Sequence, residues 1–286
     1  SRGCAELKRL AYLPFPRGVR FLYLQRHYGS PEYWSKLSGA ILNSDSSYGS
    51  ALAALIQRKG IMPKAHFSIS CGAPLRQKKH LSPETILDRF KKANIVDEID
   101  VPGVGACVVL AQLINRTEPD IEYFRARLVT EAILLKAIKM WLRNLGFTSY
   151  EKIAVRGVGS TLPQIGTFAW DLTGPSYLAP MINWSSNGKL SPGFIACDIL
   201  LGSEVTESGL RPFIQKCTTL KNLKRIGRCL QIFVADSYSR EAFAKAKSVG
   251  IVPATPETLF GKEVAEGLKQ LTDVLTQAAK ASMKPE

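Results

Sequence analysis

The chain has few of the residues that hold structural zinc. It contains three histidines in 286 residues, and its six cysteines include no Cys-x-x-Cys pair. Zinc fingers and zinc ribbons need Cys and His ligands at short, regular spacings, so both are excluded. Scattered cysteines of this kind are typical of reduced thiols, and we expect a cytoplasmic protein, associated with the nucleoid if the source is prokaryotic.

Long hydrophobic runs are also missing. No apolar stretch approaches the roughly 20 residues that span a bilayer, and the first residues, Ser1 to Glu6, have no signal-peptide core. We therefore expect no membrane association. No internal repeat or low-complexity tract interrupts a chain that is 45% hydrophobic, which is enough for one or two buried cores.

Acidic residues are outnumbered. Lys and Arg total 38 against 24 Asp and Glu, a formal net charge of +14, with a sequence pI near 9.6. The excess is shared by the two halves of the chain, which favours a polyanionic partner such as DNA for both. A basic protein with a solvated surface is the alternative, because net charge bears on association and not on fold.

The first 118 residues are predicted to be mainly helical and DNA-binding. Helices are expected over 19–27, 32–42 and 51–59, followed by an extended run over 65–70. Three short helices before a strand are the order of a winged helix, in which the third helix would read DNA. A further helix over 82–92 and a hairpin over 95–113 suggest the wing of a second such module, so one or two modules are predicted.

Residues 119–286 are predicted to form an α/β domain. A long helix over 121–145 precedes strands over 164–172 and 193–201, a helix over 211–226, a strand over 229–235, a helix over 239–248 and a short strand over 251–254. This order predicts a mixed central sheet flanked by helices. A final amphipathic helix over 262–279 is expected to pack on the body of the domain.

Three carboxylates stand where hydrocarbon is expected. Glu131 interrupts the apolar face of the long helix, Asp171 lies in an apolar strand-like run, and Asp198 has apolar neighbours on both sides. Because a buried carboxylate needs a cation, hydrogen bonds or a raised pKa, three of them predict a shared divalent metal. The alternatives are that Glu131 pairs with Arg127 one turn away and that Asp171 caps the turn at 173–175.

The order of elements over about 121–260 resembles that of the PD-(D/E)xK, restriction-endonuclease-like superfamily. A helix supplies a Glu, a strand pair carries two Asp 27 positions apart, and a helix, a strand and a helix follow. The resemblance implies a Mg²⁺- or Mn²⁺-dependent nuclease with Glu131, Asp171 and Asp198 as metal ligands. The pattern departs from the family at Leu200, where a lysine is expected, and at Trp170, where a proline is expected.

The helix after the Asp198 strand offers substitutes for the missing lysine. Lys216 is the first candidate to orient and deprotonate the attacking water, and Gln215 is the second, although Lys216 has the alternative role of contacting phosphate or solvent. From this helix to the next strand the positive residues have no acidic neighbour, which predicts phosphate contacts; they include Arg211, Lys221, Lys224, Arg225 and Arg228.

Three functions follow from these features. The first is a metal-dependent DNA endonuclease in defence, transposition or repair. The second is a nuclease-like subunit that binds DNA or assembles beside an active protein partner; the missing lysine favours it and the three retained acids oppose it. The third, a basic α/β enzyme acting on a small phosphorylated substrate, lacks a Gly-rich phosphate loop, the nearest stretch being 155–160. Target sequence, DNA against RNA, and oligomeric state stay open.

Overall fold

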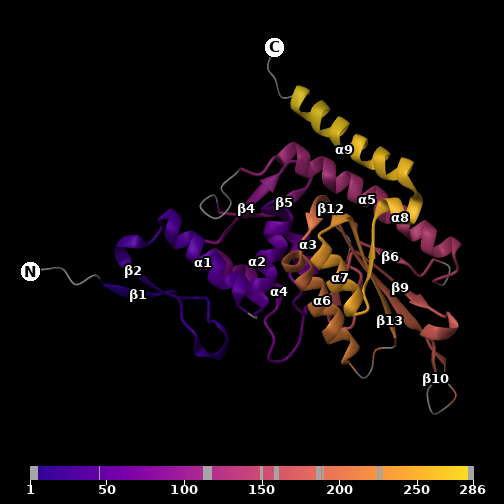
Figure 1. Ribbon diagram of the computed structural model, residues 1–286, viewed down its shortest axis with the longest axis horizontal. Coiled ribbons are helices and arrows are strands. Elements are labelled where there is room, and N and C mark those ends of the chain that lie inside the picture. Colours follow the sequence, from indigo (N-terminus) through magenta and orange to yellow (C-terminus); the bar gives the residue numbers. More distant parts are fainter. Residues whose placement is uncertain are drawn as a thin grey trace, which may run out of the picture. The chain divides into compact units, whose positions relative to one another are not determined.

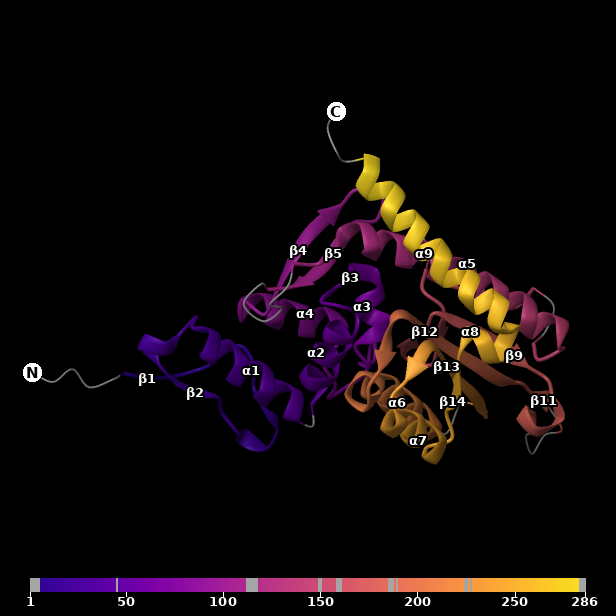
Figure 2. The ribbon, with the colours of Figure 1, turned by 45° about the horizontal axis from the view of Figure 1, so that its top comes forward.

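The computed structural model describes residues 6–44, 46–111, 118–148, 151–157, 161–184, 188, 190–223, 226 and 228–282. The chain divides into two compact units, residues 1–119 and 120–286. Each unit has its own hydrophobic core, and Figures 1 and 2 show the course of the backbone in both. Among the described residues, no helix combines the length and the apolar composition that crossing a bilayer requires.

The N-terminal unit begins with a two-stranded antiparallel ribbon, β1 (Leu7–Arg9) and β2 (Leu22–Leu24), with short 3-10 turns at Pro16–Gly18 and Gln25–His27. The helix predicted over 19–27 is therefore wrong: Leu22 and Leu24 pair with Arg9 and Leu7 across the ribbon instead. The helices predicted over 32–42 and 51–59 are confirmed as α1 (Pro31–Asn43) and α2 (Ser47–Gln57).

The rest of this unit is β3 (Ile61–Pro63), α3 (Lys64–Ser70), α4 (Pro83–Lys92), β4 (Val96–Val101) and β5 (Gly105–Leu110). The strands form one sheet in the order β3-β5-β4. The extended run predicted over 65–70 is wrong, because this segment is helical and buries Phe67 and Ile69. The predicted hairpin is confirmed as β4 and β5, which pair in register from Val96–Leu110 to Val101–Gly105.

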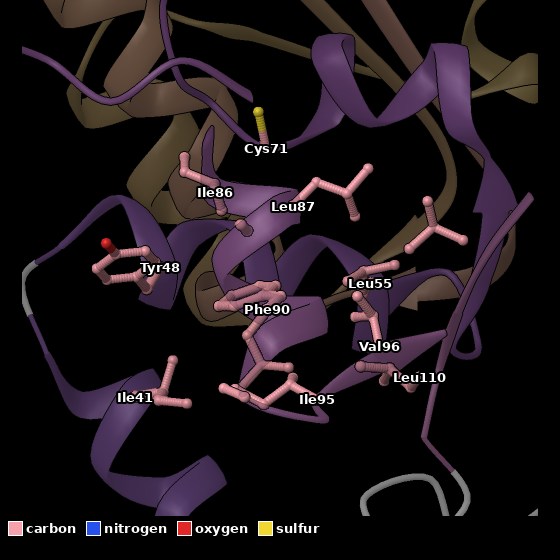
Figure 3. Close-up of a cluster of buried hydrophobic side chains, with 14 of the residues drawn as sticks. Ile41, Tyr48, Leu55, Cys71, Ile86, Leu87, Phe90, Ile95, Val96 and Leu110 are labelled. Carbon is pink, nitrogen blue, oxygen red and sulfur yellow. The ribbon is translucent and has the colours of Figure 1, made fainter. Parts of the chain in front are cut away.

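Helices α2 and α4 supply much of the core of this unit. In α4 the buried residues Pro83, Ile86, Leu87 and Phe90 recur at helical spacing, and the Ser82 hydroxyl caps the helix by accepting the Thr85 N–H at 3.2 Å. Figure 3 shows the α4 side chains among residues of α1, α2 and both hairpin strands. Nearly all of α2 is buried, so α2 has no free face for DNA and the prediction of a recognition helix at 51–59 is wrong.

The C-terminal unit has a five-stranded mixed sheet in the order β14-β13-β12-β9-β6. The strands are β6 (Ala154–Val155), β9 (Leu172–Ser176), β12 (Gly193–Val205), β13 (Cys229–Tyr238) and β14 (Val252–Ala254). β12 is antiparallel to β9 and parallel to β13, and β13 is parallel to β14. The predicted mixed α/β sheet flanked by helices is confirmed at this level.

Helices cover both faces of this sheet. They are α5 (Ile121–Asn144), α6 (Glu207–Lys221), α7 (Arg240–Ser248), α8 (Pro256–Phe260) and α9 (Lys262–Ser282). One core lies under α6 and α7, and a second lies under α5. Figures 1 and 2 show α9 running beside α5, as predicted for a helix that packs on the body.

The strand predicted over 164–172 is broken. Its residues form β7 (Gln164–Ile165) and β8 (Phe168–Ala169), a tight antiparallel pair, before β9 begins at Leu172. Gly166 turns the chain between them with a φ of 62°, a conformation that glycine adopts without strain. Minor elements follow at Ala179–Met181, β10 (Asn183–Trp184) and β11 (Leu190–Ser191). Asp171 thus lies just ahead of β9, not inside a long strand.

Candidate functional site

The three predicted carboxylates lie around the point where β9 parts from β12. Pairing between these strands ends at Leu172 and Cys197, so the next residues on each strand are Asp171 and Asp198. Glu131 reaches the same region from α5, which crosses over this face of the sheet. All three carboxylates are buried, with exposed fractions of 4%, 1% and 3% for Glu131, Asp171 and Asp198.

Beyond Cys197, no strand in the described part of the chain pairs with β12 on the β9 side, and carboxylates accept its hydrogen bonds there. The N–H of Ile199 donates to Asp171 Oδ2 at 2.7 Å, and the N–H of Leu201 donates to Glu131 Oε1 at 3.4 Å. Asp198 Oδ1 accepts the N–H of Asp171 at 3.1 Å. Because a buried N–H without an acceptor is costly, the acids have a structural task in addition to any chemical one.

Arg156 joins two of the acids. It follows β6, where its backbone N–H donates to Asp171 O at 2.8 Å. Its Nη2 donates to Glu131 Oε2 at 2.5 Å, and its Nε lies 3.2 Å from Asp171 Oδ1. The Arg156 side chain is 8% exposed, and although burial lowers the pKa of its guanidinium, the neighbouring carboxylates hold this pKa above its usual value. Arg156 therefore occupies the space between Glu131 and Asp171.

Lys216 neutralises the third acid. It comes from α6 with its side chain 1% exposed, and its ammonium forms a short ion pair with Asp198 Oδ2 and donates to Ala169 O at 3.0 Å. The same ammonium lies 4.0 Å from the centroid of the Trp170 ring, a cation–π contact. The alternative role for Lys216, contact with phosphate or solvent at the surface, is wrong because the side chain is buried.

The buried cations and carboxylates form one continuous series. It runs from Arg127, whose Nε lies 3.8 Å from Glu131 Oε1, through Glu131, Arg156 and Asp171 to Asp198 and Lys216. We call these six residues the acid–base chain. Burial raises the pKa of Asp171 to about 6, although Arg156 acts in the opposite direction. The predicted pairing of Glu131 with Arg127 is present but longer than its pairing with Arg156.

A further carboxylate and a small cavity adjoin the Glu131 end of this chain. Asp236, at the end of β13, accepts the Gly202 N–H at 2.6 Å through its Oδ2. Burial raises its pKa. A cavity of about 240 Å³ lies here, and its walls include Tyr123, Arg127 and Asp236. Gly202 has a φ of 82°, and a Cβ there would meet the Tyr123 hydroxyl at 2.1 Å, so any side chain at this position would be strained and would have to displace Tyr123.

The remaining predicted site residues lie elsewhere. Gln215 is exposed and does not share the burial of Lys216, and Arg211 is half-buried. Lys221 Nζ donates to Val249 O at 2.7 Å, and Arg228 Nη1 donates to Pro180 O at 2.8 Å, both at the surface. Lys224 and Arg225 lie outside the described residues. Phosphate contact by this group stays a prediction.

Sequence reasoning missed Arg156 and Asp236. Arg156 stood in the stretch 155–160, which was weighed only as a phosphate loop; its signal was a cation directly after the apolar run 153–155. Asp236 follows the buried apolar residues of β13 and is a carboxylate at the carboxyl end of a parallel strand, where polar sites are common in α/β sheets. Neither signal shows which residues Arg156 and Asp236 contact, because those contacts depend on the fold.

Comparison with known proteins gives little. No family model and no curated protein matches the chain. Among solved structures, the MspJI restriction endonuclease in complex with a 27-mer oligonucleotide is similar with a TM-score of 0.31 and 15% identity, covering 56% of this chain and 33% of that one. Protein VC1899 from Vibrio cholerae is similar with a TM-score of 0.24 and 10% identity, covering 90% and 54%. The chain thus spans well under two thirds of either protein, and similarity this low carries no argument.

Proposed function

We propose that the chain binds nucleic acid beside a protein partner without cutting it, and that its nuclease-like C-terminal unit holds its acidic site closed with its own cations. One observation carries the proposal. Arg156 bridges Glu131 and Asp171, while Lys216 neutralises Asp198. Three buried carboxylates are thus matched inside the chain by buried cations.

The fit of Mg²⁺ to this site is poor in the observed arrangement. Carboxylate oxygens are the ligands that Mg²⁺ prefers, so the chemical type of the donors is right. The oxygens, however, face guanidinium, ammonium and backbone N–H groups. Among the described residues, no group of three or more His, Cys, Asp and Glu is placed to hold a metal ion. We derive no catalytic step through a metal.

The main objection to a non-cutting role is the retention of three costly buried acids, and the geometry offers a reason for it. Asp171 and Glu131 accept N–H groups of β12 beyond the point where its pairing with β9 ends, and Asp198 accepts the N–H of Asp171. Removing one carboxylate would leave a buried donor unpaired, at a cost of roughly 1–3 kcal/mol. The acids are therefore useful without any metal.

Nucleic-acid binding is supported by the N-terminal unit. Its order α2-β3-α3-α4-β4-β5 matches that of a winged helix, in which α4 would be the helix that reads DNA. The segment between α3 and α4 exposes four basic side chains: Arg76, Lys78, Lys79 and His80. The β4 strand instead carries Asp97, Glu98 and Asp100, so we place phosphate contact at the basic segment and not at the hairpin.

A second candidate function is the metal-dependent endonuclease that hydrolyses phosphodiester bonds. The position of Lys216 favours it. The Lys216 ammonium lies on Asp198, next to Asp171, and could take the role of the lysine that the family has at the position of Leu200. In that function Glu131, Asp171 and Asp198 would hold Mg²⁺ or Mn²⁺, which would supply an activated water and stabilise charge on phosphate. Arg156 would first have to leave the carboxylates, and the exposed Gln215 would stay outside the site.

Calorimetric titration of the full chain with Mn²⁺, combined with a cleavage assay, separates the two functions. Labelled duplex, single-stranded and branched DNA and RNA are incubated with the protein and Mg²⁺ or Mn²⁺. The closed site predicts no stoichiometric metal binding and no cleavage, together with salt-dependent binding of nucleic acid. Stoichiometric Mn²⁺ binding with cleavage that is abolished by Asp171→Ala and Asp198→Ala establishes the endonuclease and overturns the first proposal.

A further inference from the structure

The N-terminal unit has a cavity of about 450 Å³ beside the loop that joins β1 to β2. Phe15, Val19 and Phe21 form apolar walls, and Arg17, Arg20 and Asn43 add polar groups. This volume is in the range of roughly 300–1,000 Å³ typical of ligand sites. None of these residues belongs to the acid–base chain.

Two of the walls are fixed by packing. Phe15 and Phe21 are half-buried and pack against the core of the unit, and the Phe21 ring makes an edge contact with Tyr33 at 5.8 Å between centroids. Arg17 and Arg20 are exposed, so their guanidinium groups remain accessible to solvent. The cavity therefore has packed aromatic surfaces next to exposed positive charges.

The backbone of this loop is strained at one of the arginines. Arg17 has a φ of 57°, in the left-handed region that residues other than glycine seldom adopt. Such strain persists only where the surrounding structure imposes it, and it is concentrated at ligand sites. The conformation gives an independent reason to look for a ligand at this loop.

We propose that this cavity binds one unstacked nucleobase, while Arg17 and Arg20 contact the phosphates that flank it. Aromatic side chains stack on the face of any base, and arginine binds phosphate through its planar fork of donors. The Asn43 amide offers both a donor and an acceptor, which a base edge can match. The site goes beyond the proposed function, because it does not depend on whether the acid–base chain cuts.

The charge of the surrounding segment fits this occupant. Residues 6–30 contain five Lys or Arg and a single acidic residue, Glu6. A polyanionic strand would be attracted along this segment before a base entered the cavity. An acidic peptide would use the same arginines but would gain nothing from stacking, so stacking is the property to test.

The experiment compares two strands of equal charge. Fluorescence anisotropy measures binding of the full chain to a labelled 12-nucleotide thymidine strand and to an abasic strand with the same backbone. We expect the thymidine strand to bind about tenfold or more tightly, the scale of one base–aromatic stack. Arg17→Gln with Arg20→Gln should weaken both strands, because phosphates are common to both. Equal affinity of the unmodified protein for the two strands overturns the proposal.

A matched pair of variants locates the effect. Val19 is 62% exposed, so Val19→Trp should fill the cavity without disturbing the core; we expect it to abolish the preference for thymidine and leave affinity for the abasic strand unchanged. Leu22 is 54% exposed and lies outside the cavity lining, so Leu22→Trp should keep the preference. If Val19→Trp weakens both strands equally or neither, or if an acidic peptide competes better than thymidine, the cavity is not a base site.

Discussion

Arg156→Leu is the change that most directly tests the acid–base chain. The guanidinium contacts Glu131 Oε2 at 2.5 Å and Asp171 Oδ1 at 3.2 Å while only 8% exposed. Removing one partner of a buried ion pair typically costs about 3–5 kcal/mol, because the remaining charge is left unpaired. Two carboxylates are left here, so we expect a loss at the upper end of that range.

Hydrogen exchange followed by mass spectrometry measures this loss where it occurs. Peptides that cover β12 contain the N–H groups of Ile199 and Leu201, which the two carboxylates accept. A loss of about 3–5 kcal/mol corresponds to an increase of roughly 10²- to 4 × 10³-fold in the exchange rate of these amides. Arg143→Leu, at an exposed position of the same unit, is the matched control and should change exchange little.

Adding Mn²⁺ to this variant then tests whether a metal ion can take the place of the Arg156 guanidinium. With Arg156 gone, Glu131 and Asp171 present two uncompensated carboxylates, and Mn²⁺ should restore stability by about 2.7 kcal/mol at a hundredfold excess over its dissociation constant. The unmodified protein should show no such gain. A loss below about 1 kcal/mol in Arg156→Leu, or equal stabilisation of both proteins by Mn²⁺, refutes the reasoning.

Three further outcomes follow. Lys216→Met should lower the free energy of unfolding, measured by chemical denaturation, by about 3–5 kcal/mol, because it leaves the Asp198 charge buried and unpaired. The double variant Lys216→Met with Asp198→Leu leaves no such charge and should lose much less; equal losses would contradict this. The pKa of Asp171 is raised from 3.8 to about 6, so its contribution to stability is complete below pH 3.8 and is lost as the pH rises through 6. The free energy of unfolding of Asp171→Asn in urea, taken relative to that of the unmodified protein, should therefore rise by up to about 3 kcal/mol between pH 4 and 7, and a constant difference would contradict this. Gly202→Ala should destabilise the unit in thermal melts, with partial recovery in combination with Tyr123→Ala, whose side chain is the obstruction; no recovery would point to the backbone alone.

Periodicity and capping signals were enough to predict most elements of the C-terminal unit. The 24 residues of α5 and the apolar runs of β12 and β13 carry long, regular patterns, and their structure follows from local preference. Short segments were ambiguous. Residues 64–70 alternate apolar and polar side chains like a strand but fold as α3, because packing against the unit outweighs local preference in seven residues.

The three carboxylates and Lys216 of the candidate site were predicted from the sequence, and Arg156 was missed. A carboxylate inside an apolar run is conspicuous in a sequence, whereas Arg156 follows a two-residue strand and gives no pattern of its own. Its role depends on β6 lying beside β9, which places its backbone against Asp171, and on α5 bringing Glu131 over the same point. These are tertiary relations between segments 25 and 15 positions apart in the chain, and no local rule supplies them.

The energetic cost of the acid–base chain bears on what it is for. Buried ion pairs seldom stabilise a fold relative to well-packed apolar residues of the same volume. A unit selected for stability alone would place hydrocarbon around Trp170 and Phe213, where Lys216 now lies between two aromatic rings. The arrangement instead specifies where β9 and β12 separate, because each carboxylate fixes a particular N–H of the gap. This point, with its carboxylates, buried cations and fixed N–H groups, is the feature that a binding role and a cutting role would share.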